Sequence, residues 1–153
     1  PTVHRSTEAW LAAMSATRTR MRKVLVTASA AGRHISRNQY RLLVMRHAAE
    51  RYLFLAEREI ALDDIARSLQ SHAMATPDMG LRAGAADRLK DLADRLAHLR
   101  KVYQSLWQES TRPDGLTIID KRLLRQENDF RELERSARDG SLAVWRPGGA
   151  HGT

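Results

Sequence analysis

The chain has 153 residues, a formal net charge of +8 and no cysteine. A chain of this length forms one domain with its own core, and 42% hydrophobic with 29% charged residues is typical of a globular helical protein. The absence of cysteine excludes disulfides, thiolate metal sites and a cysteine nucleophile. No apolar run approaches the roughly 20 residues that cross a bilayer.

Abundant Ala, Leu and Arg and sparse β-branched residues favour helix along the whole chain. We expect an all-α fold, an antiparallel bundle of about four main helices in residues 1–140, followed by a flexible tail in residues 141–153. No secretory signal is visible, which favours a cytoplasmic location, although the chain starts with Pro and a removed signal peptide stays open.

The first helix is predicted over residues 8–31, where apolar side chains recur in alternating steps of four and three. That stripe consists of Trp10, Met14, Thr17, Met21, Leu25 and Ala28. Gly32 follows it and suits the position just beyond a helix C-terminus. The basic residues of this segment fall off the stripe, so we expect them to face solvent.

Most of the net charge lies in this first helix and the loop after it. Residues 1–41 contain eight basic residues against Glu8 alone, a net charge of +7. Such a region suits nucleic acid, an anionic membrane or an acidic protein surface, but side chains that read bases are few in it. The candidate polyanion contacts are Arg18, Arg20, Arg22, Lys23, Arg33, Arg37 and Arg41.

The second helix is predicted from about residue 36 to residue 72. It opens with a capping box, in which the Ser36 hydroxyl accepts from an unpaired N–H group and Gln39 reaches back. Its apolar residues cover more than one face, so we expect this helix to be the most buried of the four.

The third helix, predicted over residues 85–109 after a turn at 76–80 and a start delayed by Gly84, has the most regular pattern in the chain. We call this pattern the leucine stripe; it consists of Leu89, Leu92, Leu96, Leu99, Tyr103 and Leu106. Its spacing of 3, 4, 3, 4, 3 predicts a helix that buries one side against other helices.

The fourth helix is predicted over residues 117–139 and ends at Asp139-Gly140. Its apolar stripe consists of Ile119, Leu123, Gln126, Phe130, Leu133 and Ala137. With short connections, four such helices predict an up-down arrangement.

No set of residues in the sequence forms a recognisable reaction centre or cofactor site. His47-Ala48-Ala49-Glu50 reverses the Glu-x-x-His order of helical di-metal sites and has no second copy, so no metal, cofactor or catalytic residue is assigned. A helical enzyme that uses His47, Glu50 and Tyr52, and a phosphoacceptor role for His47, are minor alternatives. Asp87, Asp91 and Asp94 recur among basic residues, a pattern typical of a solvated, salt-bridged helix face.

The end of the third helix carries a resemblance to a known family. Leu106-Trp107 followed by Arg112-Pro113-Asp114-Gly115-Leu116 resembles a C-terminal segment of family-20-type glycoside hydrolases, the β-N-acetylhexosaminidase group. Thr111 stands where that segment has Asn, and Asp114 where it has its first Gly. Residues 43–51 look like the preceding helix of the same region, so the similarity extends loosely over residues 40–135.

The resemblance implies the helical appendage of such a hydrolase and not its catalytic barrel. The family's catalytic Asp-Glu pair has no counterpart, because the chain contains no Asp-Glu dipeptide. The leading expectation is therefore a non-catalytic helical accessory domain, whose partner is another protein or a catalytic domain of the same polypeptide. The alternative is a stand-alone basic bundle that binds nucleic acid or an acidic protein partner.

Overall fold

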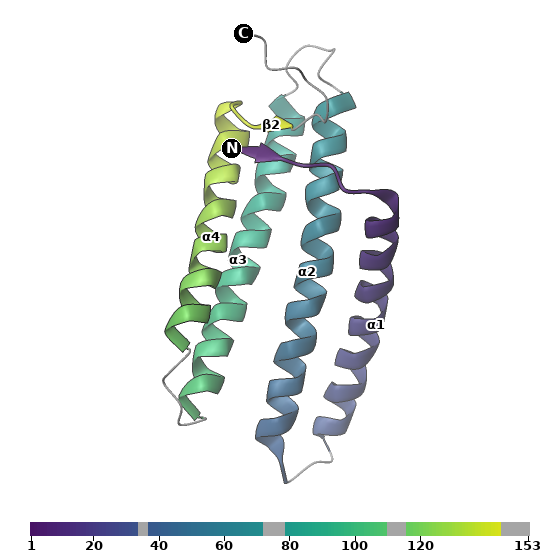
Figure 1. Ribbon diagram of the computed structural model, residues 1–153, viewed down its shortest axis with the longest axis vertical. Coiled ribbons are helices and arrows are strands. Elements are labelled where there is room, and N and C mark those ends of the chain that lie inside the picture. The colour runs from purple at the N-terminus through teal and green to yellow at the C-terminus, as the bar shows by residue number, and fades with distance from the viewer. Residues whose placement is uncertain (34–36, 72–78, 110–115, 145–153) are drawn as a thin grey trace.

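The computed structural model describes residues 1–33, 37–71, 79–109 and 116–144. Four helices make up most of it: α1 (Glu8–Gly32), α2 (Gln39–Ser71), α3 (Met79–Glu109) and α4 (Leu116–Asp139). Two short strands, β1 (Thr2–Val3) and β2 (Ala143–Val144), pair in parallel at one end (Figure 1). The prediction of an all-α antiparallel bundle is confirmed.

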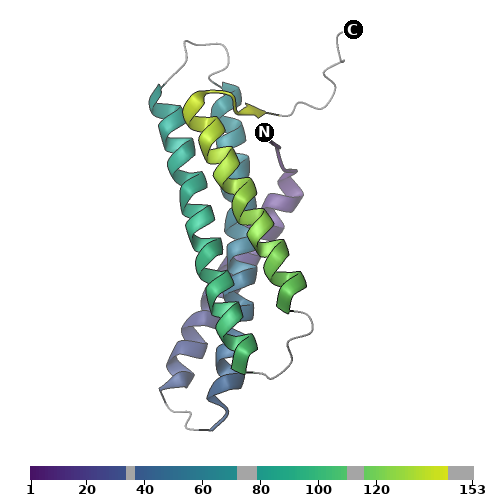
Figure 2. The ribbon, with the colours of Figure 1, turned by 90° about the vertical axis from the view of Figure 1, so that its left-hand side faces the viewer.

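The helices pack mainly against their neighbours in sequence. α1 lies on α2, α2 on α3, and α3 on α4, and the four run antiparallel (Figures 1 and 2). Consequently α1 and α4 pack on different helices instead of closing a four-membered ring. One side of the α2–α3–α4 layer stays open, and the candidate site lies there.

The leucine stripe of α3 forms the centre of the core, as predicted. All six of its residues are buried, and residues of α2 and α4, such as Phe54, Ile65 and Phe130, pack around it. The expectation that α2 would be the most buried helix is wrong. α3 lies between α2 and α4 and contributes more of the core, whereas α2 leaves large apolar side chains exposed near its N-terminal end.

α3 begins at Met79, six residues before the predicted start. Gly84 was expected to delay the helix, but it lies within the helix, and a Cβ added there would meet nothing within 4 Å. A glycine inside a helix costs only about 1 kcal/mol relative to alanine. The burial of Ala85 and Ala86 on the same helix offsets that cost, so the helix extends through the glycine.

A buried carboxylate, that of Asp63, holds the N-terminal segment against the C-terminal half of α2. Asp63 is 1% exposed and accepts hydrogen bonds from the Arg5 Nε at 3.0 Å, the Ser6 backbone N–H at 2.8 Å and the Arg67 Nε at 2.5 Å. Burial alone would raise the pKa of Asp63, but these three donors outweigh burial and lower it.

The predicted flexible tail begins too early in the chain. Residues 141–144 are ordered, because Leu142 packs against the core and its N–H donates to the Ser136 carbonyl at 2.9 Å. Gly140, with φ of 82°, turns the chain back so that Ala143–Val144 can pair with β1. The remainder of the predicted tail, residues 145–153, lies outside the described residues, as does Ser36 of the predicted capping box.

Candidate functional site

A groove runs between α2 and α4 over the leucine stripe of α3, and we call it the α2–α4 groove. Its volume is about 560 Å³, within the range of typical ligand-binding clefts. It is lined by Ala48, Arg51, Tyr52, Phe54, Leu55, Arg58, Leu96, Leu99, Ile119, Arg122, Leu123 and Gln126.

The floor and walls of the groove are apolar because three helix stripes meet there. Leu96 and Leu99 of the leucine stripe supply the floor, Phe54 and Leu55 supply the α2 wall, and Leu123 lies on the α4 wall. Leu96 is 2% exposed, so the floor is part of the core itself. The apolar surface that a ligand can reach therefore comes mainly from the walls, where Leu55 and Ile119 are half-buried and Tyr52 is exposed.

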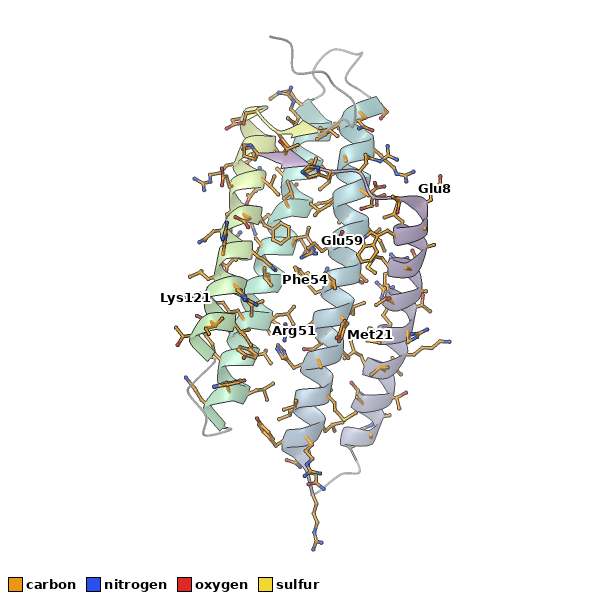
Figure 3. All side chains as sticks on the ribbon, viewed as in Figure 1. Glu8, Met21, Arg51, Phe54, Glu59 and Lys121 are labelled. Carbon is orange, nitrogen blue, oxygen red and sulfur yellow. The ribbon has the colours of Figure 1, made fainter. Side chains whose placement is uncertain are left out.

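Three arginines stand around this apolar surface. Figure 3 shows Arg51 and Phe54 extending from the side of α2 that faces α3 and α4. Arg58 donates to its neighbour Glu59 at 2.9 Å, whereas Arg51 and Arg122 have no carboxylate partner among the described residues. Among the residues that the structure describes, no carboxylate lines the groove. Its electrostatic character is accordingly cationic above an apolar floor, which suits an anionic, amphipathic ligand.

A buried aromatic cluster lies one helical turn from the groove, between α2 and α3. The rings of His47 and Tyr103 have centroids 6.0 Å apart, and those of Tyr103 and Trp107 are 5.5 Å apart. Both ring nitrogens of His47 and the Tyr103 hydroxyl are buried without a hydrogen-bond partner in the described part of the chain. Burial, followed by Arg51 and His98, lowers the pKa of His47, so the imidazole is neutral near pH 7.

The residues of the minor enzyme alternative do not converge. His47 is buried against α3, whereas Tyr52 is 59% exposed on the groove side of α2. Glu50 lies 3.9 Å from Arg46 in an ion pair on a third side of the helix. In the described ranges, no group of three or more His, Asp or Glu residues is arranged to hold a metal ion.

The seven predicted polyanion contacts lie along α1 and around the α1–α2 connection. Arg18 is half-buried, and the other six are exposed. Arg22 forms an ion pair with Glu57 at 2.7 Å, which neutralises it locally. None of these seven cations lines the α2–α4 groove.

The acidic residues of α3 are salt-bridged on the surface, as predicted. Asp94 pairs with Lys90 at 2.7 Å and Asp87 with Arg138 at 3.2 Å. Sequence reasoning missed the groove and its residues Arg51, Arg58 and Arg122. The available signal was the second apolar face of α2, which we took for a buried face.

Comparison with known protein families, with curated proteins and with solved structures gave no match. None of the described helices is long and apolar enough to cross a membrane. Residues 111–115 of the hexosaminidase-like turn lie outside the described residues.

Proposed function

We propose that this chain is a non-catalytic docking domain that binds an acidic amphipathic helix of a protein partner in the α2–α4 groove. The observation that carries the proposal is the apolar floor formed by Leu96 and Leu99 beneath cationic edges. An amphipathic helix would place its apolar stripe on that floor and its carboxylates near Arg51 and Arg122. Helix-in-groove recognition of this kind uses anchors at spacings of three and four.

The length of the groove favours a helix as the occupant. Its α2 wall runs from Ala48 to Arg58, which at 1.5 Å per residue is about 15 Å, or roughly three helical turns. An added helix would lie beside α2 and α4 in the place that a closed bundle fills with its own fourth helix. A second copy of α1 is a poor occupant, because α1 is itself basic.

We also propose an accessory role beside a catalytic domain of the same polypeptide, on the strength of the hexosaminidase-like residues. The resemblance of Leu106-Trp107 and Arg112-Pro113-Asp114-Gly115-Leu116 to that family's C-terminal region supports it. The reading frame upstream of Pro1 tests it. A segment that encodes a barrel would support this relation, and a start codon directly before Pro1 would contradict it.

Titration with a peptide tests the docking proposal. The probe is a fluorescent amphipathic helix of about 14 residues, with Leu at positions i, i+3, i+4 and i+7 and Glu elsewhere. We expect a dissociation constant on the order of 10 µM by fluorescence anisotropy. The same peptide with Lys in place of Glu should bind at least tenfold more weakly, because it meets the groove arginines with like charge.

One double variant in the groove and one matched double control locate the site. Arg51→Gln with Arg122→Gln should weaken the acidic peptide roughly tenfold, whereas Arg88→Gln with Arg135→Gln, at the other end of the molecule, should leave it unchanged. Equal effects of the two pairs would contradict docking in the groove. Binding of dodecyl sulfate at submicellar concentration without any binding of the peptide would instead assign the groove to a small anionic amphiphile.

A further inference from the structure

The C-terminal end of α1 and the N-terminal end of α2 form a second, separate surface. We call residues 20–33 and 37–45 the hairpin tip. Its lowest part reaches past the lower ends of α3 and α4 in both ribbon views (Figures 1 and 2), while Tyr40 still contacts Leu106 in the last turn of α3. Because α3 and α4 do not extend as far as α1 and α2 at this end, side chains on several sides of the tip are exposed.

The hairpin tip concentrates the charge of the whole protein. Residues 20–33 and 37–45 contain six basic residues and no acidic residue, whereas the complete chain has a net charge of +8. Within the tip, Arg22 has Glu57 as a partner. The other cations of the tip have no carboxylate partner among the described residues; they are Arg20, Lys23, Arg33, Arg37 and Arg41.

Exposed aliphatic side chains are interleaved with these cations. Val26 is 72% exposed, Met45 63% and Leu43 44%, and all three are flanked by basic residues one helical turn away or nearer on their helices. On α1, Arg22, Val26 and Ser29 follow one another at spacings of four and three and so share a face. The tip thus combines charge with apolar groups that water solvates poorly.

We propose that the hairpin tip binds the surface of an anionic lipid bilayer. The arginines and Lys23 would contact the headgroup phosphates and carboxylates, while Val26, Leu43 and Met45 insert among the headgroups. The binding of a helical surface to a bilayer strengthens with the apolar area that it buries and with its electrostatic attraction to anionic lipids. The described ends of α1 and α2 lie beyond the ends of α3 and α4, so the rest of the bundle does not keep them from a flat surface (Figures 1 and 2).

The exposed aliphatic groups favour lipid over nucleic acid as the partner. A phosphate backbone pairs with the cations but leaves Val26 and Met45 in water. Single-stranded nucleic acid needs aromatic platforms, and the one aromatic residue of the described tip, Tyr40, donates its hydroxyl to the Leu106 carbonyl at 3.0 Å. Lipid headgroups accommodate both kinds of side chain.

Co-sedimentation with vesicles tests the proposal. The whole chain should bind vesicles of phosphatidylcholine with about 30% phosphatidylserine, bind pure phosphatidylcholine far less, and lose affinity as salt rises. Arg37→Gln with Arg41→Gln should lower the partition coefficient roughly fivefold per arginine. The double variant Arg88→Gln with Arg135→Gln removes the same charge at the other end of the molecule and should leave the partition coefficient nearly unchanged.

The apolar contribution is tested by a matched pair of double variants. Val26→Ser with Leu43→Ser should reduce vesicle binding at least fivefold. Met79→Ser with Leu124→Ser alters residues of similar exposure, 77% and 38%, outside the tip and should leave binding unchanged. Thermal melts followed by circular dichroism establish that each of the four double variants, the two arginine variants and the two serine variants, is folded. The groove variants Arg51→Gln and Arg122→Gln should bind vesicles like the unmodified protein, which separates this proposal from peptide docking.

A single spin label gives a second measurement, because the chain has no cysteine of its own. A nitroxide at Val26→Cys should become less accessible to a water-soluble nickel chelate when anionic vesicles are added, whereas one at Met79→Cys should not. Equal protection of both sites, or equal vesicle binding by tip and control variants, would overturn the proposal. So would tight binding of a DNA duplex by a chain that ignores vesicles, which would assign the tip to nucleic acid.

Discussion

Phe54 of α2 and Phe130 of α4 meet edge to face, with ring centroids 6.4 Å apart and an interplanar angle of 85°. This contact lies beyond the last α4 residue that lines the groove, Gln126, toward the C-terminal end of α4. It joins two helices that both pack on α3. Phe54 also lines the α2–α4 groove, so this aromatic contact forms part of the groove's α2 wall.

Truncation of Phe130 tests the importance of that contact. Phe130 is 6% exposed, so Phe130→Ala should lower the free energy of unfolding by about 3–5 kcal/mol in urea melts. In a double-mutant cycle with Phe54→Ala, the coupling energy should be about 0.5–1.5 kcal/mol. A coupling energy of zero would mean that the two rings do not stabilise each other.

The buried carboxylate of Asp63 should be the most sensitive polar position in the upper half of the molecule. Asp63→Asn removes the charge that holds Arg5 and Arg67, and we expect a loss of roughly 2–4 kcal/mol in the free energy of unfolding. Asp64→Asn, at the exposed neighbouring position, should change it by less than about 0.5 kcal/mol. Because the pKa of Asp63 is lowered on folding, its contribution to stability should be fully present above its ordinary pKa and be lost as pH falls from there through the lowered pKa of the folded state.

The leucine stripe gives a prediction about the core and about the floor of the groove. Leu96→Ala should cost roughly 2–5 kcal/mol of stability, as truncations of buried leucines do. Lys101→Ala, on the exposed side of the same helix, should stay within about 0.5 kcal/mol. Urea melts that show similar losses for both variants would contradict the assignment of the buried face.

His47 makes the stability of the α2–α3 contact depend on pH. Its pKa in the folded protein lies below the ordinary value of 6.5, so the unfolded chain binds a proton that the folded chain excludes as pH falls below 6.5. The free energy of unfolding should therefore be highest above that value and decline toward pH 5. In His47→Leu this component should disappear, whereas in His4→Gln, at an exposed position, it should remain. Identical pH profiles of the unmodified protein and His47→Leu would contradict a buried neutral imidazole.

The fold could be predicted from the sequence wherever the spacing of the apolar residues indicates which side chains are buried. Leu96 and its stripe lie in the regular core of α3, and the spacing predicted all of them correctly. The predicted start of α3 was wrong because Gly84 lowers the local helix propensity, whereas the buried alanines after it stabilise the helix. Residues 141–144 were missed because Leu142 and Val144 are ordered by contacts with distant parts of the chain, which local pattern does not report.

The candidate site was less predictable than the fold. Apolar residues on two sides of α2 indicated a deeply buried helix, but Leu55 and Tyr52 border an open groove because α1 packs on the opposite side of α2. Whether an apolar face is covered depends on where the next helix lies, and that is a tertiary property. Arg51 and Arg122 are far apart in sequence, and only the packing of α2 and α4 on α3 brings them to one groove.

The central claim is that the groove receives an acidic helix, and paramagnetic NMR of the complex tests it most directly. The chain, with methyl groups labelled, is mixed with the acidic amphipathic peptide carrying a nitroxide at its centre. The account predicts strong broadening of the methyl signals of Leu55, Ile119 and Leu123, and unchanged signals from Val26 at the hairpin tip. Broadening at Val26 with sharp signals from the groove methyls would contradict the account.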